Sequence, residues 1–186
     1  LEHGGQPIAI PLRKALALFI YLAVTRQPHS RDALATLFWP ERNQQGARTN
    51  LRRTLYDLGQ LLGAPLGDQL LQIEPETVSL HPEAALWVDI AVFEQGLAQH
   101  LSVPPAAQVL PHDERLELTS LADLYTDDFL AGFSLPDCPA FAEWQFFQRE
   151  ALRNAYARLL QQLVFVYAAE EKWDEALRYA RRWLLI

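Results

Sequence analysis

Residues 44–63, QQGARTNLRRTLYDLGQLLG, carry a regular stripe of apolar side chains. Its members are four or three positions apart, the spacing that places side chains on one side of an α-helix. They are Ala47, Leu51, Leu55, Leu58 and Leu62. Glycine often terminates helices, so Gly63 predicts the end of this one. The stretch therefore predicts a helix that packs on a core along the stripe.

The opposite face of this predicted helix is polar. It presents Thr49, Arg53, Tyr56 and Gln60, with Arg52 and Asp57 beside them and Arg48 and Asn50 nearer its edges. Guanidinium, hydroxyl and amide groups can bind phosphates and hydrogen-bond to base edges, so this face is a candidate DNA-reading surface. An ordinary solvated helix face is the alternative that composition alone favours.

Two further helices are predicted before it. Residues 13–25 follow the i, i+3, i+4, i+7 pattern with Leu16, Phe19, Ile20 and Ala23. Ser30 is a natural N-cap for a short second helix, which Trp39 and Pro40 would close. The apolar residues expected to be buried in that helix are Ala33, Leu34, Leu37 and Phe38. A helix, a turn, a short helix and a long polar-faced helix are the order of a helix-turn-helix core.

A β-hairpin is predicted after Gly63. Two short alternating runs, residues 71–73 and 78–80, flank a turn that contains Pro75. A three-helix core followed by a hairpin is a winged helix, and residues 7–10 could add a small strand before it. Glu74 and Glu76 lie at the predicted hairpin tip, where they would repel phosphates.

Charge is distributed unevenly along the chain. The 186 residues have a net charge of −7, which taken alone argues against a nucleic-acid partner. Residues 1–63, however, hold eight Arg or Lys against four acids, a net charge of +4. Residues 64–100 hold six acids and no Arg or Lys. The predicted DNA-reading segment lies within the basic part. Within a Debye length of about 8 Å local charge matters more than net charge, so the acidic total does not exclude DNA binding.

Composition limits the class of protein. No apolar run is long enough to cross a bilayer, and no signal segment begins the chain, so we expect no membrane partner. The single Cys138 is consistent with a reducing, cytoplasmic location. The chain contains neither a phosphate-binding glycine loop with Lys nor a catalytic or metal-ligating constellation, so we expect no enzyme, cofactor or metal site.

The second half is predicted to be helical. Helices are expected over residues 113–125, with Leu116, Leu121 and Leu124 apolar, and over about residues 139–168, with a short helical turn at 127–132 between them and a loop over 101–107 before them. Tyr167, Ala176 and Ala180 then follow the spacing of a tetratricopeptide repeat. We expect two domains, residues 1–82 and 83–186. The chain lacks methionine and stops inside a helical pattern, so we expect the second domain to be truncated at its C-terminus.

Several motifs, in order, resemble those of one known family. They are RKA at 13–15, HSRDALA at 29–35, FWPE at 38–41, ARTNLR at 47–52, WVDIAVF at 87–93, YTDDFLAGF at 125–133 and EW at 143–144. With these motifs, in this order, the chain resembles the SARP-type bacterial transcriptional activators. The resemblance implies an OmpR-like winged helix-turn-helix domain followed by a TPR-like bacterial transcriptional activator domain (BTAD). It also implies transcription activation on promoter repeats, often as a dimer, with contact to RNA polymerase.

We therefore expect a mainly α protein that regulates transcription by binding double-stranded DNA. Arg53, Thr49 and Tyr56 would face bases, whereas Ser30, Arg31, Arg48 and Arg52 would anchor phosphates, with Asn50 at the edge of the surface. The helical domain would hold a homodimer or contact RNA polymerase or another protein. The alternative is a protein–protein signalling module of the same fold that no longer binds DNA, which the acidic hairpin tip and the acidic remainder favour.

Overall fold

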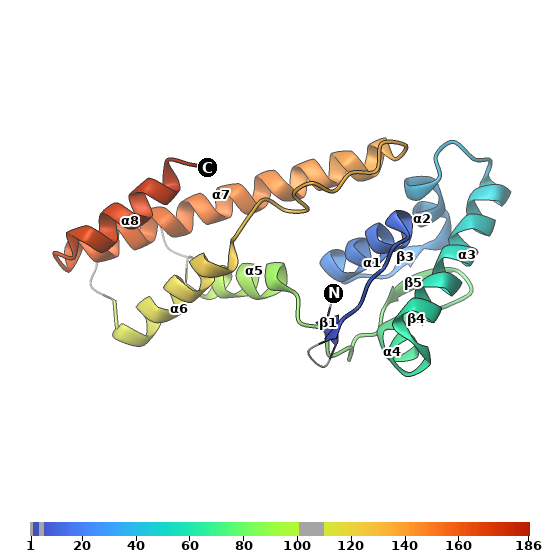
Figure 1. Cartoon of the computed structure of the whole chain (residues 1–186), viewed down its shortest axis with the longest axis horizontal. Coiled ribbons are helices and arrows are strands. Elements are labelled where there is room, and N and C mark those ends of the chain that lie inside the picture. Colours follow the sequence, from blue (N-terminus) through green and yellow to red (C-terminus); the bar gives the residue numbers. More distant parts are fainter. Residues whose placement is uncertain (1, 4–5, 101–109) are drawn as a thin grey trace. The chain divides into compact units, whose positions relative to one another are not determined.

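The computed structural model describes residues 2–3, 6–100 and 110–186 (Figure 1). This part of the chain is mainly helical, with eight α-helices and a small three-stranded antiparallel sheet. It forms two compact units: unit 1 comprises Leu1–Val88 and Ser134–Glu143, and unit 2 comprises Asp89–Phe133 and Trp144–Ile186. The predicted domains 1–82 and 83–186 are consecutive stretches. The two units of the structure are not consecutive stretches, because residues 134–143 pack with unit 1.

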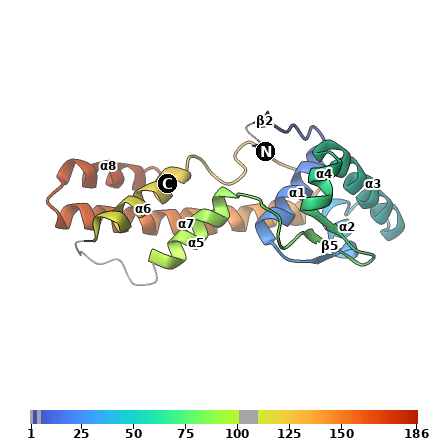
Figure 2. The ribbon, with the colours of Figure 1, turned by 90° about the horizontal axis from the view of Figure 1, so that it is seen from below.

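Four helices belong to unit 1: α1 (Arg13–Thr25), α2 (Arg31–Phe38), α3 (Gln44–Leu62) and α4 (Ala64–Leu70). The first three were predicted, with the bounds of α1 and the N-cap of α2 at Ser30 confirmed. The fourth was not predicted. It follows Gly63 directly and packs against α3, as Figure 2 shows.

The buried face of α1 differs from the predicted one. Its core-facing residues are Ala15, Ala17, Leu18, Phe19, Leu22 and Ala23, whereas Leu16 and Ile20 are only half-buried. In α2, Leu34, Ala35 and Phe38 are buried, but Ala33 is exposed and Leu37 half-buried. Both helices are apolar over a wide arc, so periodicity leaves more than one possible buried stripe.

The predicted hairpin is confirmed. Strands β4 (Leu71–Ile73) and β5 (Thr77–Leu80) are antiparallel, with Ile73 opposite Val78. A third strand, β3 (His29–Ser30), pairs with the other edge of β5, giving the order β3-β5-β4. The strand expected at residues 7–10 is wrong: β2 (Gln6–Pro7) pairs instead with β1 (Glu2–His3) in a separate two-stranded sheet.

Residues 134–143 join unit 1 through the end of α2. The ring centroids of Phe38 and Phe141 are 5.5 Å apart, and both side chains are fully buried. The Cys138 thiol donates a hydrogen bond to the Phe38 carbonyl oxygen at 3.2 Å. Lys14 donates to the same oxygen from Nζ at 2.6 Å. These contacts satisfy the last carbonyl group of α2, which has no partner within the helix.

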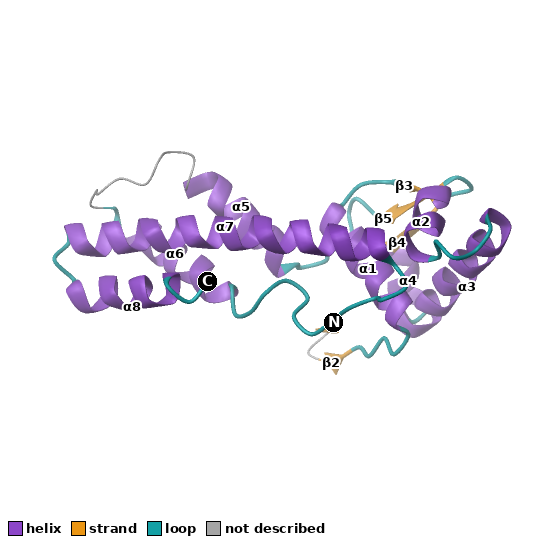
Figure 3. Cartoon of the chain, turned by 90° about the horizontal axis from the view of Figure 1, so that it is seen from above, coloured by secondary structure: helices purple, strands orange, loops and turns teal. Residues whose placement is uncertain are grey.

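Four helices follow: α5 (Asp89–His100), α6 (His112–Leu124), α7 (Pro139–Ala169) and α8 (Trp173–Trp183). The predicted helices at 113–125 and 139–168 are confirmed to within one residue. The loop expected over residues 101–107 lies outside the described residues. Figure 3 shows helices and loops in this half, without strands among the described residues.

The helical turn predicted at residues 127–132 is wrong. Leu130 and Gly132 have positive φ angles of 53° and 72°, which no α-helix contains. The amide of Gln145 on α7 donates to the carbonyl oxygens of Leu130 and Phe133 at 3.3 and 2.9 Å. Arg153, also on α7, binds both carboxylate oxygens of Asp128. The segment is therefore held by α7 and not by helical hydrogen bonds.

The core of unit 2 lies along α7. Leu159, Leu160 and Leu163 are fully buried, and the rings of Tyr125 and Tyr156 stack 4.2 Å apart. Tyr167 and Tyr179 stack 5.5 Å apart and join α7 to α8, which run side by side in Figures 1 and 3. None of the described helices has the length and apolar character to cross a membrane.

Candidate nucleic-acid interface

Helix α3 is oriented as its sequence predicts. The Asn43 side chain accepts a hydrogen bond from the backbone N–H of Gly46 at 2.9 Å and caps the N-terminus. At the other end Gly63 has φ +83°, a conformation that glycine adopts without strain, and the helix stops. The buried residues of α3 are the five predicted ones: Ala47, Leu51, Leu55, Leu58 and Leu62. The polar face is consequently turned to solvent.

Three side chains on this face are free to meet a ligand. The Arg53 side chain is 84% exposed, with Nε 3.9 Å from the Asp57 carboxylate, and Tyr56 is 66% exposed. Arg52 is exposed and has no side-chain hydrogen bond or ion pair among the described residues. Because one helix carries all three groups, their relative positions are set before any ligand arrives.

Arg48 is already engaged by a neighbouring acid. Its Nε and Nη2 both donate to the carboxylate of Asp32 in the first turn of α2, the latter at 2.6 Å. These hydrogen bonds hold the pKa of Asp32 below its ordinary value and raise the pKa of Arg48. The sequence predicted a phosphate anchor at Arg48. In the structure its side chain forms a two-pronged ion pair, whose charge is balanced within unit 1.

Ser30 and Arg31 connect α2 to the hairpin. The Ser30 hydroxyl oxygen accepts a hydrogen bond from the backbone N–H of Ala33 at 3.1 Å, so its first role is to cap α2. The backbone N–H of Arg31 donates to the Glu76 carbonyl oxygen, and its guanidinium donates to the Glu74 carbonyl oxygen at 3.1 Å. Both residues therefore lie where the helix, β3 and the hairpin turn meet.

The hairpin turn adds negative charge at this point. Glu74 and Glu76 are both exposed. After Asp32, Glu76 is close enough to contribute to the raised pKa of Arg48. Asp32 and Glu76 thus both act on Arg48 on the hairpin side of α3, whereas the Arg31 guanidinium binds a backbone carbonyl group. Among the arginines of α3, Arg48 and Arg53 have acidic partners, and Arg52 has none among the described residues.

The remaining two predicted residues differ in exposure. Thr49 is exposed, and its hydroxyl donates to the Gln45 carbonyl oxygen one turn earlier at 2.9 Å. Asn50 is half-buried on the flank of α3 that faces α1. It lines an open depression of about 450 Å³ together with Arg53, Asp57, Lys14 and Arg13.

Arg13 and Lys14 were not among the predicted site residues. Arg13 donates to the Ser134 carbonyl oxygen at 2.7 Å, and the Lys14 ammonium lies 5.5 Å from the centre of the Trp39 ring. Forty residues separate them from Arg53 in sequence, so only the shared positive charge of residues 1–63 could have indicated them. They extend the basic surface along the flank of α3 opposite the hairpin.

Comparisons with known proteins add no family. No family model matches the chain, and searches of curated proteins and of solved structures found no similar protein. Within residues 2–3, 6–100 and 110–186, no group of three or more His, Cys, Asp and Glu side chains is arranged to hold a metal ion.

Proposed function

We propose that this protein is a DNA-binding transcription regulator that inserts α3 into the major groove. The observation that supports this most directly is the exposed row of Thr49, Arg52, Arg53 and Tyr56 on a helix whose other side is fully buried. An α-helix fits the major groove of B-DNA, and arginine pairs with guanine through two hydrogen bonds. Each such pair contributes about 1 to 3 kcal/mol of base discrimination.

The arrangement of unit 1 supports a winged-helix assignment. Helices α1, α2 and α3 are followed by the β4–β5 hairpin, and β3 ties the start of α2 to that hairpin. In this assignment Ser30 and Arg31 lie at the helix start that approaches a phosphate, and Arg52 contacts the backbone beside the groove. The acidic turn at Glu74 and Glu76 points to a wing that does not grip DNA.

Unit 2 is proposed to serve protein contacts. The family resemblance of its motifs implies an activator domain, and the helical pair α7 and α8, stacked through Tyr167 and Tyr179, supports a TPR-like fold. Phe146 and Phe147 are adjacent on α7 and more than half exposed, with their rings 5.6 Å apart. An exposed aromatic pair of this kind is suited to contact with RNA polymerase or another protein partner.

Fluorescence polarisation with labelled duplex DNA tests the proposal. Binding is measured at two or more salt concentrations with a random duplex, and selection from a random library then identifies the preferred sequence. Phosphate contacts require affinity to fall as salt rises, with a slope of log K against log salt of about −0.9 per contact, so three contacts give roughly −3. No binding at low salt, or binding that is independent of salt, would contradict DNA recognition by α3.

A signalling module without DNA binding is the second candidate. It is favoured by one observation: the guanidinium groups of Arg31 and Arg48 are bound to the Glu74 carbonyl and the Asp32 carboxylate within the protein. If the polarisation experiment shows no binding, this candidate replaces the first.

A further inference from the structure

An open depression on unit 1 lies between the first turn of α1, Trp39 after α2, and one flank of α3. Its volume is about 450 Å³, which falls within the range of pockets that hold small molecules. Every residue that lines it belongs to unit 1, so its shape is set within that unit alone. We call it the α1–α3 depression.

Helix α3 contributes four polar side chains to the α1–α3 depression. They follow the i, i+3, i+4, i+7 spacing and therefore lie along one flank of the helix, beside its buried stripe. They are Asn50, Arg53, Thr54 and Asp57. Asn50 and Thr54 are half-buried, and among the described residues neither side chain makes a hydrogen bond. Two neutral donors are thus available to a ligand in the depression.

Helix α1 contributes the cations of the opposite wall, Arg13 and Lys14. The Nζ of Lys14 donates to the Phe38 carbonyl oxygen at 2.6 Å and lies 5.5 Å from the centre of the Trp39 ring, so its position is fixed. Both contacts are with uncharged groups, and Lys14 forms no ion pair within the part of the chain that the structure describes. An ammonium group has three donors, so Lys14 can bind a ligand without giving up these contacts.

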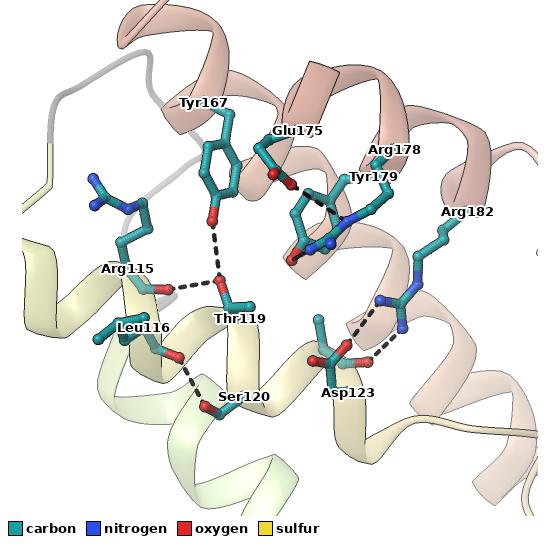
Figure 4. Close-up of polar contacts among 11 residues, drawn as sticks. Arg115, Leu116, Thr119, Ser120, Asp123, Tyr167, Glu175, Arg178, Tyr179 and Arg182 are labelled. Atoms are coloured by element: carbon teal, nitrogen blue, oxygen red, sulfur yellow. Dashed lines mark hydrogen bonds and ion pairs between the residues drawn. The ribbon is translucent and has the colours of Figure 1, made fainter. Parts of the chain in front are cut away.

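The arginines of α8 show the other arrangement, in which the protein itself supplies the anion. Arg182 lies 3.0 Å from the Asp123 carboxylate, and Arg178 lies 3.4 Å from that of Glu175 (Figure 4). Among the residues that line the α1–α3 depression, Asp57 is the only acid, and its carboxylate is 3.9 Å from the Nε of Arg53. Three cations and one carboxylate line the depression, so it attracts an anion.

We propose that the α1–α3 depression binds a phosphate group. Lys14 and Arg53 supply positive charge from two walls, and the Asn50 amide and the Thr54 hydroxyl donate hydrogen bonds beside Arg53. Phosphate oxygens accept such hydrogen bonds, and those from charged donors are the strongest. The group belongs either to a free phosphorylated molecule of up to about mononucleotide size or to a DNA backbone that runs beside α3.

Occupancy by a free molecule would compete with DNA, because both use Arg53. Such a molecule is then an effector of DNA binding, and this regulatory role rests on the proposed function. Binding of phosphate itself requires no DNA. A protein that binds phosphate in the depression but no DNA would refute the proposed function and leave the phosphate site standing.

NMR spectroscopy of the ¹⁵N-labelled full chain tests the site directly. The side-chain amide of Asn50 and the backbone amide of Thr54 are followed while inorganic phosphate is added at constant ionic strength, with chloride as the balancing anion. We expect both signals to shift and to saturate together, with a Kd on the order of 1 mM. Replacing phosphate with more chloride should move neither signal.

Two substitutions locate the site on the flank of α3. Asn50→Asp should weaken phosphate binding at least about tenfold, because it places a carboxylate beside the anion. Asn154→Asp is the matched control, since it makes the same change at an exposed position of α7, and it should leave binding within about twofold. Thr54→Val keeps the shape of the side chain, adds no charge, and should weaken binding about threefold by removing one donor.

Two further ligands distinguish the source of the phosphate. If the occupant is a free molecule, adenosine monophosphate should bind at least about tenfold more tightly than inorganic phosphate and displace labelled duplex DNA. If the occupant is the DNA backbone, adenosine monophosphate should bind no more tightly than phosphate. In that case Asn50→Asp should weaken DNA binding at least about threefold more than Asn154→Asp does.

Three results would overturn the inference. One is the absence of a saturable shift of the two signals up to about 50 mM phosphate. Another is an equal effect of Asn50→Asp and Asn154→Asp on phosphate binding. The third is phosphate binding to which neither the nucleotide nor the DNA measurement responds, which would indicate an adventitious ion only.

Discussion

Arg48 on α3 donates two hydrogen bonds to the carboxylate of Asp32 on α2, so a cation at the edge of the proposed DNA-binding face is already paired with an anion. This ion pair joins the two helices that a helix-turn-helix protein uses to approach DNA. It also lowers the positive potential of that face, because both partners are exposed and lie together. The strength of DNA binding should therefore depend on Asp32.

We expect Asp32→Asn to strengthen binding of duplex DNA by about three- to tenfold at low salt, because it removes an anion and frees Arg48 for phosphate. The salt slope should become steeper by about 0.9, the value of one further phosphate contact. Asp113→Asn, the same change of charge at an exposed site in unit 2, is the control. Equal gains in the two variants would indicate a net-charge effect without a role for Arg48.

Replacing Arg52 and Arg53 with alanine together should weaken DNA binding by about tenfold or more, because two exposed guanidinium groups leave the face of α3. Alanine favours helix, so helix content measured by circular dichroism should not change. Arg158→Ala removes an exposed arginine from α7 and should alter affinity by less than about twofold. Unchanged binding of the double variant would remove α3 from the contact surface.

The apolar side of α3 should carry its stability. Leu58 is fully buried, and Leu58→Ala is expected to lower the free energy of unfolding by about 2 to 5 kcal/mol. Gln60 lies two residues later on the exposed face, and Gln60→Ala should change the free energy of unfolding by less than about 0.5 kcal/mol. Urea denaturation followed by circular dichroism measures both. Similar losses in the two variants would contradict the assignment of the faces.

Acid should weaken unit 2 through Asp128. Its hydrogen bonds with Arg153 hold the pKa of the Asp128 carboxyl below its ordinary value. A lowered pKa in the folded state stabilises the protein above the unfolded value of 3.8, and this stabilisation is lost as pH falls through the folded pKa. Between about pH 5 and 2 the free energy of unfolding should therefore fall more steeply with decreasing pH for the wild type than for Asp128→Asn. Parallel curves would show that the pair does not contribute.

Local patterns were sufficient for several elements. The stripe of α3 and its terminal glycine act within one or two helical turns, and the structure agrees with both. The hairpin was likewise predictable, because alternation on both sides of Pro75 is a local signal. Helix α1 shows where such signals fail. RKALALFIYLAVT is apolar on most sides, so the helix was predicted but its buried face was not.

Other features depend on residues far apart in sequence. Strand β3 has two residues, and it forms because β5, more than forty positions later, offers a free edge. Residues 134–143 join unit 1 because Phe141 and Cys138 contact Phe38 one hundred positions earlier. The segment at 127–132 does not form the predicted helical turn, because Gln145 and Arg153 on α7 hold it in another conformation through hydrogen bonds.

The candidate site divides in the same way. Sequence alone determined that α3 turns Thr49, Arg53 and Tyr56 to solvent, because a 3.6-residue repeat assigns opposite faces of one helix. Only the tertiary structure decided which arginines keep their charge available. Arg48 is paired and Arg52 is not, because an ion pair forms with whatever acid the fold brings within a few ångströms, and no local pattern encodes that neighbour.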